Sequence, residues 1–242
     1  MKTCAFTGHR PKGLSYPESA GRCAALKEKL RSLIIRMIEE EGVTHFISGM
    51  AQGVDMYAAE IVLELKKQYP QITLECTIPY ERQAAYWSEP LRNRYFSIAE
   101  QCDQETMLQR QYTPDCLRKR NRYMVDHAEI VLAVWNGRPS GTGQTVWYAR
   151  ETGKPVWILR PDTLEVDFCF WQELLCFLIL PEHLSVSFAD SSPQGEPSHP
   201  KASPRGEVPP TAAERWRTKK APSTGRWRAK VVGLARMGRT WI

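Results

Sequence analysis

The stretch that decides the fold is residues 130–145, IVLAVWNGRPSGTGQT. It opens with a continuous apolar run, residues 130–135, which is typical of a central parallel strand with both faces covered. The run ends in a glycine-containing loop, and helix-like sequence follows from Thr142 to Thr152. A buried strand, a loop and a helix in this order predict one unit of an α/β sheet.

The same alternation extends over the first 160 residues. Apolar residues at helical spacing follow Ser15-Tyr16-Pro17-Glu18, which fits a capping box, and Gly42 is a natural stop for that helix. The expected strands span residues 2–7, 44–48, 72–78, 105–108, 130–135 and 156–159, and the expected helices span residues 23–38, 54–69, 81–101, 115–127 and 142–152. Such alternation implies right-handed crossovers. The predicted fold class is α/β, with a doubly wound, mainly parallel, Rossmann-like sheet and a disordered C-terminal tail.

Composition divides the 242-residue chain into three segments. Residues 1–160 form the predicted Rossmann-like domain, residues 161–186 an additional helix or docking segment, and residues 187–242 a basic tail rich in Pro, Ser and Gly. The net charge of +6 comes from the tail, where 11 Lys and Arg against 4 Asp and Glu give +7. The rest of the chain holds 22 basic against 23 acidic residues, or −1. This near-neutral body argues against a strong groove for a polyanion.

The tail carries three tryptophans, Trp216, Trp227 and Trp241, among its Arg and Lys residues. Aromatic residues interleaved with basic ones can bind nucleic acid. Nucleic acid is therefore a candidate partner of the tail, while a plain disordered extension is the default interpretation.

Cysteine usage and hydropathy indicate a reducing, aqueous compartment. The seven cysteines form no Cys-x-x-Cys pair, and the sequence opens without a signal peptide, so the cytoplasm is the expected location. The longest apolar run, residues 168–180, contains Gln172 and Glu173 and is too short to span a bilayer. No membrane partner, metal or other cofactor is predicted, and a homo-oligomer is left open.

Three loops at predicted strand ends carry the residues for anion binding. They are Thr7-Gly8-His9-Arg10-Pro11, Ser48-Gly49-Met50-Ala51-Gln52-Gly53-Val54-Asp55 and Pro139-Ser140-Gly141-Thr142-Gly143-Gln144-Thr145. Ligands of open parallel sheets bind at the carboxyl ends of the strands, glycine permits close backbone approach, and a helix start attracts phosphate. Each loop alone is equally well explained as a turn. None matches Gly-x-Gly-x-x-Gly or a Walker A loop, so ordinary NAD binding and ATP hydrolysis are disfavoured.

These loops resemble those of the SLOG superfamily, and within it the YpsA-type proteins. The resemblance covers about residues 1–159 and rests on the motifs at 7–11, 48–55, 120–126 (RNRYMVD) and 141–149. It implies a Rossmann-like fold and the binding of a nucleotide or nucleotide-derived ligand.

Two distant branches of that superfamily suggest sharper activities. Lonely Guy-type phosphoribohydrolases cleave the N-glycosidic bond of nucleoside 5′-monophosphates with a Pro-Gly-Gly-x-Gly-Thr-x-x-Glu motif and an upstream arginine. Residues 139–145 correspond to that motif, and Arg122 or Arg118 could match the arginine. Thr145 stands where the motif has its glutamate, and threonine cannot supply the catalytic carboxylate. The second branch is DNA processing protein A, which binds single-stranded DNA and whose Ser-Gly-x-Ala-x-Gly-x-Asp loop resembles residues 48–55.

Several other residues have two interpretations each. The basic residues at 118–120 and 122 form either a solvated helix face or, through Arg120 or Arg122 with Asn121, a grip on phosphate or ribose. Asp55 either stabilises a helix start or contacts a ribose hydroxyl.

Aromatic residues follow the third predicted strand, near the expected mouth of the site. They are Tyr80, Tyr86 and Trp87. Packing is the leading interpretation for these side chains, and base stacking is the alternative.

The sequence thus predicts a protein that binds or senses a nucleotide-like small molecule, and more readily a binder than an enzyme. The predicted ligand-binding residues are Thr7, Gly8, His9, Arg10, Ser48, Gly49, Gln52, Gly53, Asp55, Asn121, Arg122, Ser140, Gly141, Thr142 and Thr145. The phosphate is expected on the glycines and Thr142, with Arg10 or Arg122 balancing its charge. The alternatives are a nucleotide N-glycoside hydrolase and a single-stranded nucleic acid binder.

Overall fold

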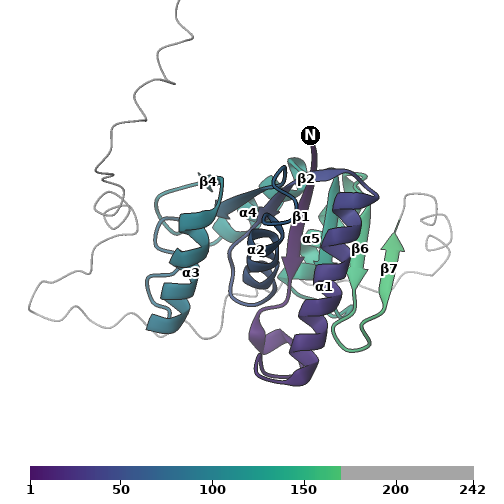
Figure 1. Cartoon of the computed structure of the whole chain (residues 1–242). Helices are drawn as coiled ribbons and strands as arrows, with labels where there is room; N and C mark the ends of the chain where they lie inside the picture. The colour runs from purple at the N-terminus through teal and green to yellow at the C-terminus, as the bar shows by residue number, and fades with distance from the viewer. Residues whose placement is uncertain (170–242) are drawn as a thin grey trace, which may run out of the picture. The chain divides into compact units, whose positions relative to one another are not determined.

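A computed structural model describes residues 1–169 of the chain (Figure 1). The strands are β1 (Lys2–Gly8), β2 (Val43–Ser48), β3 (Thr73–Ile78), β4 (Gln104–Met107), β5 (Ile130–Val134), β6 (Val156–Leu159) and β7 (Val166–Cys169). The helices are α1 (Gly21–Glu39), α2 (Val54–Leu65), α3 (Glu89–Gln101), α4 (Cys116–Asp126) and α5 (Gly141–Glu151), with a short 3₁₀ turn at Pro11–Gly13.

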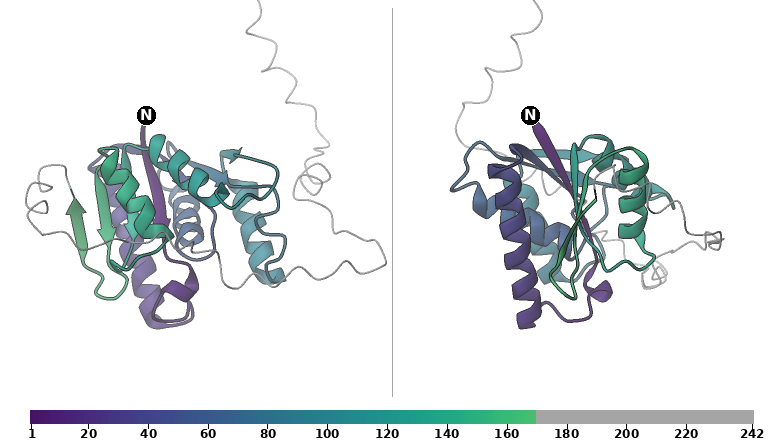
Figure 2. Two further views of the ribbon diagram at one scale, coloured as in Figure 1. Left: turned by 180° about the vertical axis from the view of Figure 1, so that it is seen from behind. Right: turned by 90° about the vertical axis from the view of Figure 1, so that its right-hand side faces the viewer.

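The strands form one seven-stranded sheet in the order β4-β3-β2-β1-β5-β6-β7. All neighbouring pairs are parallel except β6 and β7, which are antiparallel. Helices α1, α2 and α3 cover one face, and α4 and α5 cover the other (Figure 2). The strand order reverses between β1 and β5, so the carboxyl ends of these two strands mark the switch point at which open α/β sheets bind ligands. The predicted doubly wound, mainly parallel α/β class is confirmed.

The core forms where each helix lays an apolar stripe on the sheet. Every residue of β5 is buried, as its continuous apolar sequence predicts. Val131 and Ala133 of this strand pack against Val146 and Ala149 of α5. On the opposite face, buried residues recur along α1 at helical spacing, and they are Cys23, Leu26, Leu30, Leu33, Ile34, Met37 and Ile38.

The start of α1 differs from the prediction. The helix begins at Gly21 with Ala20 as its N-cap residue, so the proposed capping box at 15–18 is wrong. The side chains of that segment have distant partners instead, since Ser15 Oγ donates to Asp162 Oδ1 at 2.6 Å and Tyr16 Oη donates to the Pro161 carbonyl at 2.8 Å. Residues 9–20 therefore form a long connection that is anchored on the turn between β6 and β7.

Two other boundaries differ for local reasons. Helix α3 starts at Glu89 rather than near residue 81, because Pro90 is favoured in a first helical turn and disfavoured inside a helix. Helix α2 ends at Leu65, four residues before the expected end at Tyr69.

Residues 161–186 are predicted to form an additional helix or a docking segment, and the first part of this segment contains strand β7. The pairing of β7 with β6 places Phe168 beside Trp157, with ring centroids 4.8 Å apart in an edge-to-face arrangement. Residues 170–186 and the tail at 187–242 lie outside the described residues. Across residues 1–169, no helix combines the length and the apolar character that a membrane span requires.

Gly8 gives the first prediction, because α2 packs against the end of β1. A Cβ atom at Gly8 would lie 2.5 Å from the Cβ of Val54, far inside van der Waals contact. We expect Gly8→Ala to lower the free energy of unfolding by about 1–3 kcal/mol through overpacking. Gly21→Ala is the control, because a Cβ at Gly21 meets nothing within 4 Å and alanine raises helix stability by up to about 1 kcal/mol. Urea unfolding measures both changes, and equal effects of the two substitutions would contradict the packing argument.

Candidate functional site

The β1 and β5 loops are held together by His9 at the switch point. Its Nε2 atom accepts the backbone N–H of Asn136 at 3.2 Å, and its carbonyl accepts the N–H of Val54, the first residue of α2, at 3.3 Å. The side chain is 6% exposed, and burial lowers the pKa of the imidazole. A neutral ring with Nε2 as an acceptor fits both observations. His9 thus joins three loops through its ring and its carbonyl, and its contact with an anion stays a prediction.

The β2–α2 loop takes its shape from its own contacts. Ser48 is fully buried, and its Oγ donates to the Asp55 carbonyl at 2.8 Å and accepts the N–H of Met50 at 3.2 Å. Gly53 has a φ of 93°, and a Cβ there would lie 2.6 Å from the His9 carbonyl oxygen. Glycine is required at position 53 by this backbone conformation and by the approach of the first loop.

A buried ion pair fills the space behind this loop. Arg120 of α4 and Asp55 of α2 are 5% and 6% exposed, with Arg120 Nη1 3.5 Å from Asp55 Oδ2. The same Nη1 donates to the Gly49 carbonyl, and a Cβ at Gly49 would overlap the guanidinium. The lack of a side chain at Gly49 therefore admits Arg120.

The electrostatics of the pair follow from its burial. Burial raises the pKa of the Asp55 carboxyl, while the Arg120 charge and the Ala51 N–H, 3.3 Å from Oδ2, oppose that change. Burial likewise lowers the pKa of the Arg120 guanidinium, opposed by Asp55. The Asp55 carboxylate thus depends on Arg120 to remain ionised, and the guanidinium depends on Asp55 to balance its buried charge.

Arg120 is also linked to α5. Its Nε donates to Asn121 Oδ1 at 2.8 Å, and Asn121 Nδ2 donates to Thr145 Oγ1 at 2.9 Å. The Thr145 hydroxyl in turn donates to the Gly141 carbonyl at 3.0 Å. Asn121 and Thr145, both predicted as ligand contacts, are therefore brought together and engage each other.

The start of α5 is open. Ser140 is the N-cap residue, and its Oγ accepts the N–H of Gly143 at 3.1 Å, as expected of a capping serine. A Cβ at Gly141 would meet nothing within 4 Å, in contrast to Gly8, Gly49 and Gly53. Within residues 1–169, the N–H groups of Gly141 and Thr142 have no hydrogen-bond partner.

The remaining predicted site residues separate into exposed and buried positions. Arg10 is exposed in the β1 loop, and its positive charge adds to that of Arg120 in opposing the rise in the pKa of Asp55 that burial causes. Gln52 is partly exposed in the second loop, and Thr7 is 7% exposed at the end of β1. The guanidinium of Arg122 lies over the ring of Tyr148, 5.1 Å from its centroid, on the surface of α4 and α5.

The basic run on α4 therefore divides between surface and interior. Arg118, Lys119 and Arg122 are exposed, as a solvated helix face predicts. Arg120 alone of the four is buried. From the sequence it is, with Arg122, a candidate grip on phosphate or ribose, but it is not among the predicted ligand-binding residues. Its signal in the sequence was the spacing of four from Cys116 and Met124, which are both buried on the same face of α4.

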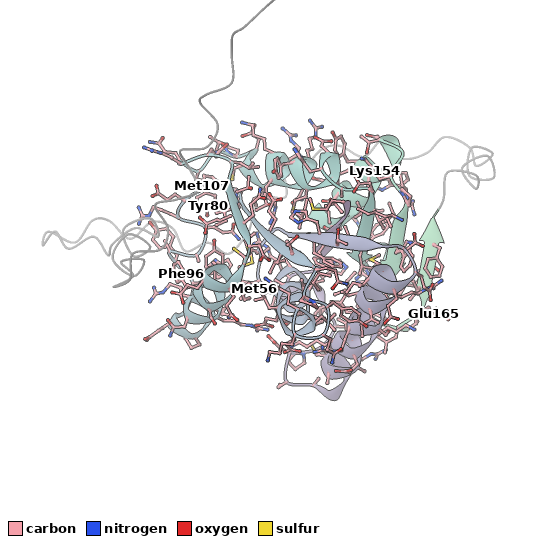
Figure 3. All side chains as sticks on the ribbon, turned by 45° about the horizontal axis from the view of Figure 1, so that its top comes forward. Met56, Tyr80, Phe96, Met107, Lys154 and Glu165 are labelled. Carbon is pink, nitrogen blue, oxygen red and sulfur yellow. The ribbon has the colours of Figure 1, made fainter. Side chains whose placement is uncertain are left out.

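The aromatic residues after β3 have partners of their own. Trp87 packs edge to face on Tyr95, with centroids 5.5 Å apart. Tyr80 makes the same arrangement with Tyr112 at 5.3 Å and lies near Met107 at the end of β4 (Figure 3). Tyr86 is 58% exposed. Packing accounts for Trp87, and base stacking by Tyr80 or Tyr86 stays a hypothesis.

The ion pair yields a stability prediction. Arg120→Met should lower the free energy of unfolding by about 3–5 kcal/mol, because it leaves the Asp55 carboxylate buried without a partner. The double variant Asp55→Leu with Arg120→Met should recover most of that loss, since an apolar pair replaces an ion pair at little cost. Urea unfolding of the two single variants and the double variant measures the coupling. A double variant as unstable as the sum of the singles would contradict the pairing.

His9 yields a pH prediction. Because its pKa in the folded protein is lower than in the unfolded chain, the unfolded chain takes up a proton first as pH falls below about 6.5. The free energy of unfolding should therefore decrease with acid in that range, and less so in His9→Gln, which keeps an acceptor for Asn136 but does not titrate. The measurement is urea unfolding at pH 8, 6.5 and 5.5, and parallel curves for both proteins would refute this role.

Comparison with known proteins places the chain among its relatives. Residues 4–162 match the model of the YspA SLOG family (YpsA). The SPbeta prophage-derived protein YoqJ of Bacillus subtilis (strain 168) is 32% identical over 161 residues, which are 60% of this chain and 94% of that protein. The YpsA protein of the same organism is 25% identical over 174 residues, 69% of this chain and 96% of that protein.

Two solved structures also match. DNA processing protein A from Streptococcus pneumoniae has a TM-score of 0.45 at 18% identity, covering 66% of this chain and 50% of the other. The protein of the same name from Helicobacter pylori has a TM-score of 0.48 at 18% identity, covering 73% and 72%. The family match spans well over half of the sequence and agrees with the motifs of all three loops, so this chain belongs to the YpsA-type SLOG family.

Proposed function

We propose that the protein binds a phosphate-bearing, nucleotide-like ligand at the carboxyl edge of its sheet, with the phosphate at the start of α5. The observation that carries this proposal is the open first turn of that helix beside the switch point. Gly141 is exposed with no side chain over it, and its N–H and that of Thr142, a residue that is 7% exposed, have no hydrogen-bond partner within residues 1–169. Unpaired N–H groups and the positive end of the helix dipole together favour an anion.

The start of α2 is a weaker candidate for the phosphate. Its first turn already holds the buried carboxylate of Asp55, which accepts the Ala51 N–H and faces Arg120. Gly8, Gly49 and Gly53 leave room for Val54, Arg120 and the first loop, respectively. These three glycines therefore build the rim of the site, and Gly141 is the one with space in front of it.

Charge supports the same location. Arg10 directly follows His9, whose ring accepts the Asn136 N–H of the β5–α5 loop, and Arg10 is exposed. An arginine can hold two phosphate oxygens at once. Ser140 and Thr142 add hydroxyl groups at the same turn.

Binding without hydrolysis is the better inference from this site. The related glycoside-cleaving motif has a glutamate where this chain has Thr145, and the Thr145 hydroxyl is engaged by Gly141 and Asn121. A threonine cannot protonate a leaving group or stabilise an oxocarbenium-like centre as a carboxylate does. We therefore assign a binding or sensing role.

Titration calorimetry of the full chain with AMP, GMP, CMP and UMP tests the proposal. Gly141→Asp should weaken binding at least tenfold, about 1.4 kcal/mol, because its carboxylate competes for the helix start. Gly21→Asp is the matched control, since Gly21 is also a first helical residue with open space around it. Equal affinities of wild type and Gly141→Asp would refute the phosphate position.

The same samples separate the alternatives. If chromatography detects free base released from a nucleoside monophosphate, the protein is a hydrolase and the proposal of binding alone is wrong. Binding of a single-stranded oligonucleotide with a steep salt dependence, without binding of any mononucleotide, would favour the nucleic acid alternative.

A further inference from the structure

We propose that a chain of hydrogen bonds, formed by Asp55, Arg120, Asn121 and Thr145, couples the start of α5 to the β2–α2 loop. We call these four residues the relay. The inference rests on the proposed function and adds a regulatory consequence, namely that an anion at α5 changes the stability of residues 49–53.

The relay is continuous across three elements. It begins at the Gly141 carbonyl, which accepts the Thr145 hydroxyl at 3.0 Å, and passes through Asn121 Nδ2 at 2.9 Å from Thr145 Oγ1. It continues from Asn121 Oδ1 to Arg120 Nε at 2.8 Å. Two links lie within one helix, Thr145 to Gly141 on α5 and Arg120 to Asn121 on α4, and the other links join different elements.

At its other end the relay holds the β2–α2 loop at several points. Arg120 Nη1 donates to the Gly49 carbonyl and lies 3.5 Å from Asp55 Oδ2. Asp55 in turn accepts the Ala51 N–H at 3.3 Å, and its own carbonyl accepts the Ser48 hydroxyl at 2.8 Å. A shift of the guanidinium would disturb both ends of the loop.

Burial makes the relay sensitive to displacement. Arg120, Asp55 and Thr145 are each no more than 6% exposed, whereas Asn121 is partly exposed, so a broken link leaves a buried polar group of one of the first three residues without its partner. Networks of this kind change between discrete arrangements rather than deforming gradually. Arginine suits the central position because its planar fork of donors serves Gly49, Asp55 and Asn121 at once, which lysine cannot do.

Arg120 is accordingly a positioning residue and not a ligand contact. An anion that orders the first turn of α5 fixes the Gly141 carbonyl and with it the Thr145 hydroxyl. Coupling between two sites is reciprocal. If anion binding at α5 stabilises residues 49–53 through the relay, an ordered β2–α2 loop must in turn raise the affinity of α5 for the anion.

The first test compares AMP affinities by calorimetry in the full chain. Thr145→Val removes the hydroxyl while keeping the shape, and Arg120→Lys keeps the charge but loses the fork. Each should weaken AMP binding about fivefold or more, the lower end of typical coupling. The double variant should bind AMP with the same affinity as the single variant that binds it less tightly, because both changes break the same chain of contacts.

Thr152→Val is the matched control on the same helix. The Thr152 hydroxyl also donates to a carbonyl four residues earlier, at 2.9 Å from the Tyr148 oxygen, but it lies at the far end of α5. This variant should bind AMP as the wild type does.

The second test uses inorganic phosphate, which lacks the base and ribose of AMP, and amide hydrogen exchange. In the wild type, phosphate should slow exchange at residues 141–143 and also at residues 49–53. In Thr145→Val at saturating phosphate, only residues 141–143 should be protected. A purely structural role of Thr145 would not change the pattern of protection in this way.

The outcomes distinguish the relay from the binding site itself. If AMP and phosphate do not bind the wild type, the proposed function fails and the relay fails with it. If both bind but residues 49–53 are protected equally in Thr145→Val, or the two substitutions weaken binding additively, the ligand site stands and the relay is overturned.

Discussion

The arrangement of the whole carboxyl edge depends on one buried guanidinium. Arg120 occupies space that only a glycine at position 49 leaves open, and its charge is balanced by Asp55 in the first turn of α2. Because an ionised group in the interior is costly without a partner, Asp55, Gly49 and Arg120 constrain one another although they come from distant parts of the chain. The β2–α2 loop therefore owes its conformation to α4 as much as to its own sequence.

This constraint changes the meaning of the glycine-rich loops. Glycines after strands suggest close approach of a ligand, but at Gly8, Gly49 and Gly53 the atoms that approach belong to the protein itself. The loops still converge at the switch point, and His9 joins them there. An open helix start at α5 remains where the strand order reverses, which is the location that the general geometry of α/β sheets favours for ligands.

Much of the fold could be predicted from sequence, because its signals are local. The apolar run at 130–134 and the spacing of apolar residues along α1 each reflect burial within one element. The mainly parallel α/β class and most element boundaries could therefore be predicted. The capping box predicted at Ser15 was wrong because the partner of this side chain, Asp162, is 147 residues away in the sequence, and no local pattern indicates it. Strand β7 was missed for the same reason, since a four-residue strand is defined by pairing with β6 rather than by its own composition.

The candidate site was predictable in outline but not in detail. Motif order identified the three loops, whereas the direction of a side chain depends on tertiary packing. Arg120 illustrates this limit. Its position among Arg118, Lys119 and Arg122 suggests an exposed side chain. Its spacing from Cys116 and Met124 indicates instead that the side chain is buried.

The anchoring of residues 9–20 on the β6–β7 turn has a consequence for where this domain ends. Ser15 and Tyr16 rely on Asp162 and Pro161, which lie beyond the last strand of the parallel series. The connection that carries His9 and Arg10 toward the switch point is thus closed by a segment near the opposite end of the domain. Opening of the β6–β7 hairpin would therefore deprive Ser15 and Tyr16 of their partners, while His9 would keep its bonds to Asn136 and Val54.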